Sequence, residues 1–531
     1  MSGEATSIKL GRRPAPGTRV GLRWRPRPRR PDELSRSDSG LRVAGVLLGA
    51  IVALSLFIVL ITANRPSLLA PTTHTGFYPR WMSGPLGGLL PGLTDNGTTL
   101  RFLFTGAILL MFGAYVWVLR CAPRLPLGWV LGAILAVHAI FLISPPLALT
   151  DIFNYINYGR MEVVHHLNPY TTIPVLEPHN DPSYALSNWH QLLSPYGPLF
   201  TLITFAVVPL GVAGSFWALK GILVAASLTT ILLVWKCARL LGRDPMSAIV
   251  LVGLNPIVLV WGLGAGHNDF LMILCMMVGF YLLLRARTWE PLPHAAGRLR
   301  ERLTAAGGLT EAWRALRGSV VPLSAAQVGA GAAFVLAAAI KASAAVLIPV
   351  VLAGLLRNPR ALVQVLVGML TAAAVVAASS LLAFGLHIPD LSTQGRLVTS
   401  ESIPNLIGLA IGAGGESETL RKVLVAALLA AILACCWLAW RRRATITAAG
   451  WASVALLVTL SWVLPWYVLW ALPLAALSPS LTLRRVTLAL GVYLIIAWAP
   501  VSGLLWNAIG FHPERTSLGR LHQRAVRELL N

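Results

Sequence analysis

The sequence predicts an all-α protein that crosses a membrane many times. Of its 531 residues 56% are hydrophobic and only 12% are charged, and the mean hydropathy is +0.70. Soluble globular proteins carry about 25% charged residues. The hydrophobic residues also form uncharged runs, as at 43–62, 102–119 and 423–440, close to the roughly 20 residues with which a helix crosses a bilayer. These observations exclude a soluble enzyme.

The first 42 residues are predicted to form a disordered, basic cytoplasmic tail. The formal net charge of the chain is +23, and residues 1–42 hold eleven Lys and Arg against four acidic residues, with many prolines and no apolar periodicity. The positive-inside rule explains this excess more simply than nucleic-acid binding does, so no nucleic-acid partner is expected. The first apolar run is long enough to span, which argues against a cleavable signal peptide.

Residues 43–506 are predicted to form one multi-spanning membrane domain with about 13 transmembrane helices (range 11–14), followed by a tail, 507–531. Arginine clusters fall on the cytoplasmic side of most predicted crossings. The predicted crossings are 43–62, 100–120, 127–147, 216–238, 247–262, 270–284, 325–340, 343–356, 361–385, 423–440, 445–463, 467–478 and 486–506.

Three further segments complete the predicted topology. Residues 151–197 are polar and aromatic and form an outer loop, whereas 285–321 carry seven arginines and three acids and form the main cytoplasmic loop. The run 198–214 is short and contains Pro209 and Gly211, so we expect a re-entrant or interfacial helix there.

Ionisable residues at membrane depth are costly and therefore candidates for function. Asp151 is placed at the outer end of the third crossing, and if 151–165 is helical, Asp151, Tyr155 and Tyr158 share one face. A carboxylate beside aromatic rings suits a general base acting on a hydroxylated substrate. Alternatively, Asp151 caps the helix and the tyrosines form an interfacial belt.

A second polar cluster is expected at the outer surface around Gly266–Asp269, where His267 and Asp269 could reach a polar headgroup. The alternative is a tight turn that needs these residue types for its geometry. Lys341 is an isolated charge at a helix hinge, which either snorkels, pairs with an acid or binds an anion such as a lipid phosphate.

Aromatic and cysteine residues give weaker signals. Trp466 and Tyr467, with Trp470 nearby, either stack on sugars or belong to the interfacial aromatic belt, which we favour from sequence. The five cysteines lie in or beside apolar runs without metal-ligand spacing and are expected to be free thiols.

Taken together, these motifs resemble the GT-C superfamily of polyprenyl-phosphate-sugar-dependent glycosyltransferases, and most of all the actinobacterial α-1,6-mannopyranosyltransferases. The resemblance covers about residues 100–480. It rests on the ordered set Asp151, Tyr158-Gly-Arg160, Asn168-Pro-Tyr170, Tyr196-Gly-Pro198, Asn255-Pro256, Gly266-His-Asn-Asp269, Lys341 and Pro465-Trp-Tyr467.

The resemblance implies a GT-C-like fold with an outer-face catalytic loop and a plasma-membrane enzyme whose active site faces outward. It implies a polyprenyl-phosphate-mannose donor, a glycolipid or mannan acceptor in lipomannan or lipoarabinomannan core synthesis, and inversion with Asp151 as general base. The donor phosphate would be bound by Arg160, Lys341 and His267. Other substrate contacts would come from Tyr155, Tyr158, Asn168, Tyr170, Tyr196, Asn268, Asp269, Trp466 and Tyr467.

No Asp-X-Asp motif lies in the outer loops, so neither a metal nor another cofactor is expected. The main alternative is a transporter or flippase of lipid-linked saccharides, but no internal repeat or Walker-type loop is visible. A non-catalytic assembly factor is a further alternative. Within the enzyme interpretation, arabinofuranosyl or glucosyl transfer stays open, because motifs do not report hydroxyl stereochemistry.

Overall fold

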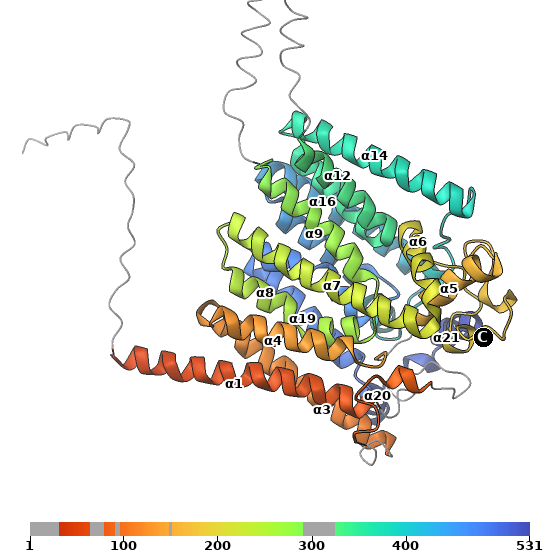
Figure 1. Cartoon of the computed structure of the whole chain (residues 1–531), viewed down its shortest axis with the longest axis horizontal. Coiled ribbons are helices and arrows are strands. Elements are labelled where there is room, and N and C mark those ends of the chain that lie inside the picture. Colours follow the sequence, from red (N-terminus) through yellow and green to blue (C-terminus); the bar gives the residue numbers. More distant parts are fainter. Residues whose placement is uncertain (1–30, 64–78, 91–95, 148–150, 290–323, 531) are drawn as a thin grey trace, which may run out of the picture.

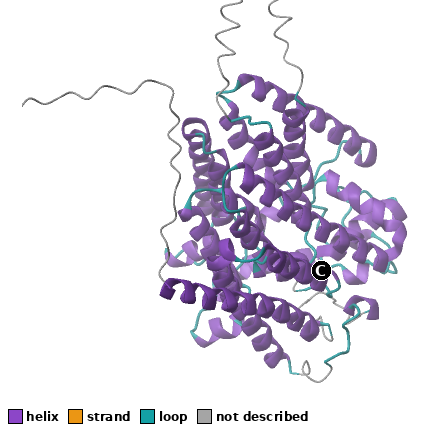
Figure 2. Ribbon diagram, turned by 60° about the vertical axis from the view of Figure 1, so that its left-hand side comes forward, coloured by secondary structure: helices purple, strands orange, loops and turns teal. Residues whose placement is uncertain are grey.

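The computed structural model describes residues 31–63, 79–90, 96–147, 151–289 and 324–530, and these residues form helices and loops without any strand (Figures 1 and 2). The predicted all-α class is therefore confirmed. Helix α1 (Pro31–Thr62) begins within the segment predicted as the N-terminal tail, so its start differs from the predicted boundary at residue 42. Most of the predicted cytoplasmic loop, 290–321, lies outside the described residues.

Five helical stretches among the described residues are long and apolar enough to cross a membrane, or seven if each of two bent pairs counts as one span. The chain is thus a multi-pass membrane protein, and five shorter apolar helices accompany the long ones. The long stretches are Gly40–Thr62 of α1, α3 (Gly97–Cys121) with its 3-10 extension to Arg124, α6 (Pro198–Val207) with α7 (Gly211–Leu240), α14 (Pro359–Phe384) and α16 (Glu418–Arg442).

Local signals explain where several of these helices begin. The side chain of Asn96 accepts hydrogen bonds from the backbone N–H groups of Thr98 and Thr99 at the start of α3, and Ser417 accepts from Leu420 N at the start of α16. Such caps satisfy N–H groups that have no partner within the helix. The remaining α-helices are α4 (Leu127–Leu142), α5 (Asp151–His165), α8 (Pro245–Gly253), α9 (Asp269–Arg285), α12 (Ala325–Ile340), α13 (Leu347–Leu355), α15 (Ile403–Ala410), α17 (Thr445–Thr459), α18 (Leu472–Leu477), α19 (Leu481–Ala497), α20 (Ser502–Ala508) and α21 (Ser517–Leu530).

Two predicted crossings are bent. Helix α8 meets the π-helix Val258–Gly264 at 55°, and α19 meets α20 at 77°. The crossing predicted over 486–506 is therefore either one broken span or a re-entrant segment, and it stays a prediction. Pro256 and Pro500 explain the breaks, because proline has no backbone N–H to continue a helix.

The segment 198–240 forms one helical stretch that is interrupted at Gly211, whose φ is +70°. A glycine is suited to this left-handed conformation because it has no Cβ. The stretch is 43 residues long, about twice the length that one crossing needs. The re-entrant prediction for 198–214 thus stays a prediction.

Helices α12 and α14 lie against one another in Figure 1 and approach closely at two glycines. A Cβ on Gly331 would collide with the carbonyl oxygen of Val365, and one on Gly368 with that of Val328. Small residues of this kind let helix backbones approach within a membrane, where packing rather than hydrophobicity holds helices together.

Replacing Gly368 by alanine should force α12 and α14 apart and destabilise the protein by about 1–3 kcal/mol, as expected for overpacking. Thermal unfolding in detergent measures the effect. Gly106→Ala on α3, where a Cβ would meet no atom within 4 Å, is the matched control and should unfold like wild type. Equal melting temperatures for both variants would contradict the close approach.

Candidate active site

Asp151 is the first residue of α5, and three elements bring polar groups to its carboxylate. His267 follows the π-helix and places Nδ1 3.5 Å from Asp151 Oδ2. The indole of Trp189, from the segment after α5, forms a side-chain hydrogen bond with Asp151. The Asp151 side chain is 16% exposed, whereas His267 is buried at 1%. Asp151 is thus a partly accessible carboxylate beside a buried histidine.

Asp269, at the start of α9, is fully buried and accepts charged and neutral hydrogen bonds. Lys341 Nζ lies 3.0 and 2.8 Å from its two carboxylate oxygens, and Trp470 donates its indole N–H to Oδ1 at 2.5 Å. Lys341 has an extended backbone (φ −150°) between α12 and the following 3-10 helix, which points its side chain to α9. Of the three alternatives for Lys341, the structure therefore shows pairing with an acid.

An aromatic layer joins these two carboxylates. His267 stacks on Trp466 with 3.5 Å between ring centroids, and Tyr467 stacks on Trp470 at 4.3 Å. The Lys341 ammonium lies 4.8 Å from the Tyr467 centroid, a distance suited to a cation–π interaction. Trp466 and Tyr467 are 1% and 6% exposed, so the favoured interpretation as interfacial belt residues is wrong.

The middle of this cluster contains buried polar atoms without hydrogen-bond partners. Among the described residues, both ring nitrogens of His267, both amide atoms of Asn268 and the Trp466 indole N–H are in this state. Buried polar groups in proteins are nearly always paired. Unpaired donors and acceptors beside a carboxylate are what a site that receives a polar ligand provides.

The predicted tyrosines line the α5 side of the cluster. Tyr155 accepts a hydrogen bond from Asn268 N at 3.4 Å, and its ring meets that of Tyr196 edge-on at 4.7 Å. Tyr158 donates its hydroxyl to Leu192 O at 2.6 Å. The helix expected over 151–165 is confirmed as α5, and it brings Asp151 and Tyr155 to the same cluster as the turn at Gly266–Asp269.

Two of the predicted substrate-contacting residues hold the segment that follows α5 instead. Asn168 donates its amide to Phe384 O at 2.9 Å and accepts from Tyr170 N. Tyr170 donates its hydroxyl to Tyr196 O at 2.9 Å. The structure does not bring these two residues to Asp151, although Tyr170 positions Tyr196, which does lie beside the cluster.

Arg160 likewise lies apart from the Asp151 cluster. Its guanidinium binds Asp181 through Nε and Nη2 at 2.9 and 2.8 Å, and His165 Nε2 reaches the same carboxylate at 2.7 Å. These bonds hold the pKa of the Asp181 carboxyl well below its usual range, despite its burial. Bidentate pairing of this kind fixes the loop 166–197 against α5.

Burial dominates the electrostatics of Asp151. It raises the pKa of the carboxyl from 3.8 to about 6, while Lys341 and the Trp189 hydrogen bond lower it and the nearby Asp269 raises it. Burial also raises the pKa of Glu177, in the segment after α5, to about 8. An Asp151 that titrates near pH 6 is ionised at neutral pH yet basic enough to accept a proton.

Sequence reasoning did not select Trp189 or Asp181 as site residues, and it named Trp470 only beside Trp466 and Tyr467. Trp470 stands four residues after Trp466 in an aromatic-rich stretch, which is a usable signal, but Trp189 and Asp181 are single residues in a loop. Within the described parts of the chain, no group of three or more His, Cys, Asp or Glu side chains is arranged to hold a metal ion.

A buried carboxylate cluster with aromatic rings inside an apolar multi-helix protein suits a membrane glycosyltransferase, and comparison with known sequences supports this class. Residues 68–357 match the profile described as "Alpha-(1->6)-mannopyranosyltransferase, N-terminal domain", and residues 400–510 match the "MptB C-terminal domain". The chain belongs to the alpha-(1->6)-mannopyranosyltransferase family, so the predicted resemblance to the actinobacterial α-1,6-mannopyranosyltransferases is confirmed.

Several characterised or named relatives are similar to the chain. Alpha-(1->6)-mannopyranosyltransferase A of Mycobacterium tuberculosis is 27% identical over 71% of this chain and 68% of its own length. The protein of that name in Corynebacterium glutamicum is 26% identical over 38% of this chain and 45% of its own length. A probable alpha-(1->6)-mannopyranosyltransferase of Mycolicibacterium smegmatis is 28% identical over 35% of each chain. No solved structure matches the chain significantly.

Lys341→Met should destabilise the protein by about 3 kcal/mol, because it leaves the buried carboxylate of Asp269 without its countercharge. The double variant Lys341→Met/Asp269→Asn should recover most of that loss, since asparagine can still accept the Trp470 hydrogen bond. Thermal unfolding in detergent measures both.

The matched control is Lys422→Met, which removes a lysine from an exposed pair with Glu418 and should have almost no effect. If Lys341→Met were as stable as Lys422→Met, the Asp269 carboxylate would not depend on its lysine.

Proposed function

We propose that the protein transfers mannose from a polyprenyl-phosphate-mannose donor to an α-1,6-mannan acceptor in the synthesis of a lipomannan core. The observation that carries the proposal is the partly accessible Asp151 carboxylate beside the unpaired polar atoms of His267, Asn268 and Trp466. The family name supports the sugar and the linkage. A lipid-linked donor suits a site built between apolar helices.

In this proposal Asp151 is the general base of an inverting transfer. The acceptor hydroxyl oxygen attacks C1 of the donor mannose as the bond from C1 to the phosphate oxygen breaks. The hydroxyl proton passes to Asp151, and polyprenyl phosphate leaves with the bonding electron pair. A single displacement of a β-linked donor then yields the α-linked product.

Lys341 is the proposed cation for the donor phosphate. An ammonium has three N–H donors, and the contacts to the two Asp269 oxygens leave one N–H for a phosphate oxygen. Its side chain is 20% exposed, whereas Asp269 is fully buried. Negative charge increases on the phosphate as the glycosidic bond breaks, so a fixed cation stabilises the transition state more than the ground state.

We further propose a GT-C-like fold for residues 43–506, with about 13 crossings, a cytoplasmic N-terminal segment and an active site facing outward from the plasma membrane. The five long apolar stretches, two bent pairs and five shorter apolar helices support a large number of crossings. The short helices cross only if the membrane is locally thin or they pair end to end, as bent pairs do.

Asp151→Asn should lower the transfer rate by about 100-fold or more, because the amide cannot accept the proton. The wild-type rate should rise as the pH increases through about 6, the pKa of Asp151. The residual rate of the variant should not show this rise. Radiolabelled polyprenyl-phosphate mannose and a short α-mannoside measure both.

Stability separates this role from a structural one. Because burial raises the Asp151 pKa above its usual 3.8, the carboxyl favours folding when protonated, and that contribution fades as pH rises from about 4 to about 6. At neutral pH Asp151→Asn should therefore be at least as stable as wild type. Asp390→Asn changes an aspartate in an exposed loop and is the matched control, which should transfer mannose at the wild-type rate. A wild-type rate for Asp151→Asn would refute the base assignment.

Single cysteines in a cysteine-free variant should test the orientation. Pro182 and Arg243 are exposed positions in different connecting segments, of which the first follows the Asp151 helix and the second is basic. An impermeant thiol reagent should label Pro182→Cys in intact cells and label Arg243→Cys only after permeabilisation. The reverse pattern would place the proposed site on the cytoplasmic face.

A further inference from the structure

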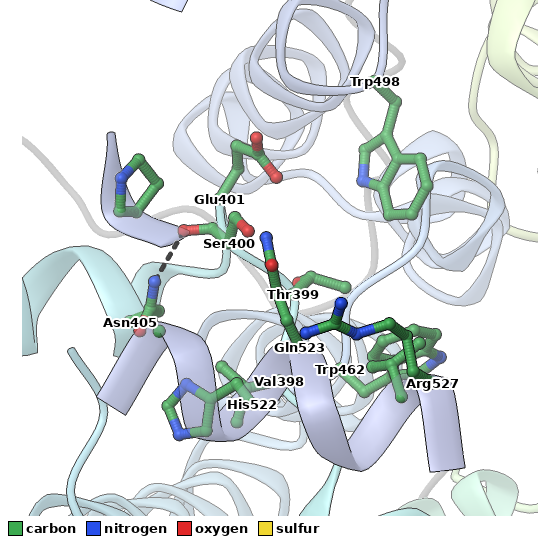
Figure 3. Close-up of a pocket in the computed structure, with 13 residues that line it drawn as sticks. Val398, Thr399, Ser400, Glu401, Asn405, Trp462, Trp498, His522, Gln523 and Arg527 are labelled. Atoms are coloured by element: carbon green, nitrogen blue, oxygen red, sulfur yellow. Dashed lines mark hydrogen bonds between the residues drawn. The ribbon is translucent and has the colours of Figure 1, made fainter. Parts of the chain in front are cut away.

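A cavity of about 390 Å³ lies between the C-terminal helix α21 and the loop that precedes α15 (Figure 3). Gln523 points from α21 toward Glu401 of the loop (Figure 3), and Arg527 of α21, Trp462 and Trp498 at the end of α19 also line the cavity. The volume falls within the roughly 300–1,000 Å³ of typical small-molecule sites. None of these residues belongs to the Asp151 cluster.

Hydrogen bonds hold the walls of the cavity in place. Thr399 N donates to Ser461 O at 2.9 Å, and the Asn405 amide donates to Ser400 O at 2.7 Å. Helix α21 is tied to the segment after α5, because Gln191 N donates to Leu529 O at 3.1 Å. Helix α21 is therefore fixed to the rest of the protein beside the cavity and is not a loose tail.

The lining suits a carbohydrate. Trp462 and Trp498 supply flat apolar surface with a polar edge, which matches the C–H faces of a pyranose ring. Glu401 offers acceptors, Arg527 donors, and the Gln523 amide both, which matches hydroxyl groups that donate and accept at once. The carboxylate and the guanidinium together give no net charge that would favour an anion.

One aromatic contact links the cavity to the proposed base. Trp462 lines the cavity and meets Trp189 edge-on, with ring centroids 6.1 Å apart. Trp189 in turn forms a side-chain hydrogen bond with Asp151. A sugar chain that lies along the two indoles would thus have one end at the carboxylate and the rest in the cavity.

We propose that this cavity binds the sugar residues of a linear mannoside acceptor that lie behind the residue being extended. The assignment rests on the proposed function, and it adds the place of the acceptor chain and the residues that hold it. Lys341, the proposed donor-phosphate ligand, lies outside the cavity lining. Donor and acceptor thus approach Asp151 from different elements, the donor from α12 and the acceptor from Trp189 and α21.

Transfer to acceptors of two lengths tests the proposal. Trp498→Ala removes a stacking surface, Arg527→Ala removes hydrogen-bond donors, and Gln523→Trp fills the cavity. The acceptors are octyl α-mannoside and α-1,6-mannotetraose. With mannotetraose, KM should rise by about tenfold with kcat nearly unchanged, since binding common to ground and transition states is lost. With octyl α-mannoside, the change should stay below about twofold.

Two matched controls remove an arginine and a tryptophan that do not line the cavity. Arg524→Ala removes an exposed arginine of α21 that does not line the cavity, and Trp437→Ala removes a tryptophan that is 53% exposed on α16. Both should behave as wild type with either acceptor. The proposal is overturned if the cavity variants match wild type with mannotetraose, or if they lose activity equally with both acceptors.

Direct binding separates this proposal from the proposed function. Saturation-transfer NMR on the full-length protein in detergent should detect α-1,6-mannotetraose with Asp151→Asn as with wild type, and should lose the signal with Gln523→Trp. If wild type bound mannotetraose in this way but transferred no mannose, the proposed function would fail while the cavity assignment held. Equal binding by wild type and Gln523→Trp would overturn the cavity assignment alone.

Discussion

The buried carboxylate of Asp269 is the constraint on which the rest of the site depends. An ionised carboxylate without partners is very costly in an apolar interior, and this one is satisfied by Lys341 and by the indole of Trp470. Those donors come from segments 72 and 201 residues away in sequence, so the charge fixes α9, the end of α12 and the aromatic stretch together. Trp466 then stacks on His267, and His267 faces Asp151.

Much of the fold could be predicted because uncharged runs and helix caps are local signals. The runs at 100–120, 361–385 and 423–440 correspond to α3, α14 and α16. Bends are harder to predict, because the run 486–506 contains no charged residue and Pro500 alone does not specify the 77° turn between α19 and α20. The number of crossings is hard to predict for the same reason, because a short or bent apolar helix can cross the membrane fully, partly or not at all.

The candidate site was only partly predictable, because sequence spacing does not report which long-range partner a polar group finds. Asp151 and Tyr155 share α5 and do meet the turn at Gly266–Asp269. Arg160 is nine residues beyond Asp151, which is roughly 13 Å along a helix, and Asp181 is its partner. Trp189 carried no signal at all, since a lone tryptophan in a loop has no periodicity to interpret.

The pairing of Asp269 with Lys341 also explains how Asp151 can be a base. A lysine bound directly to Asp151 would lower the pKa of that carboxyl and leave it a weak proton acceptor. Here the ammonium contacts Asp269 and acts on Asp151 only from a distance, while Asp269 itself raises the Asp151 pKa. Burial therefore prevails and the pKa reaches about 6. In the proposed mechanism, the second carboxylate thus holds the lysine beside the donor phosphate and at the same time preserves the basicity of the first.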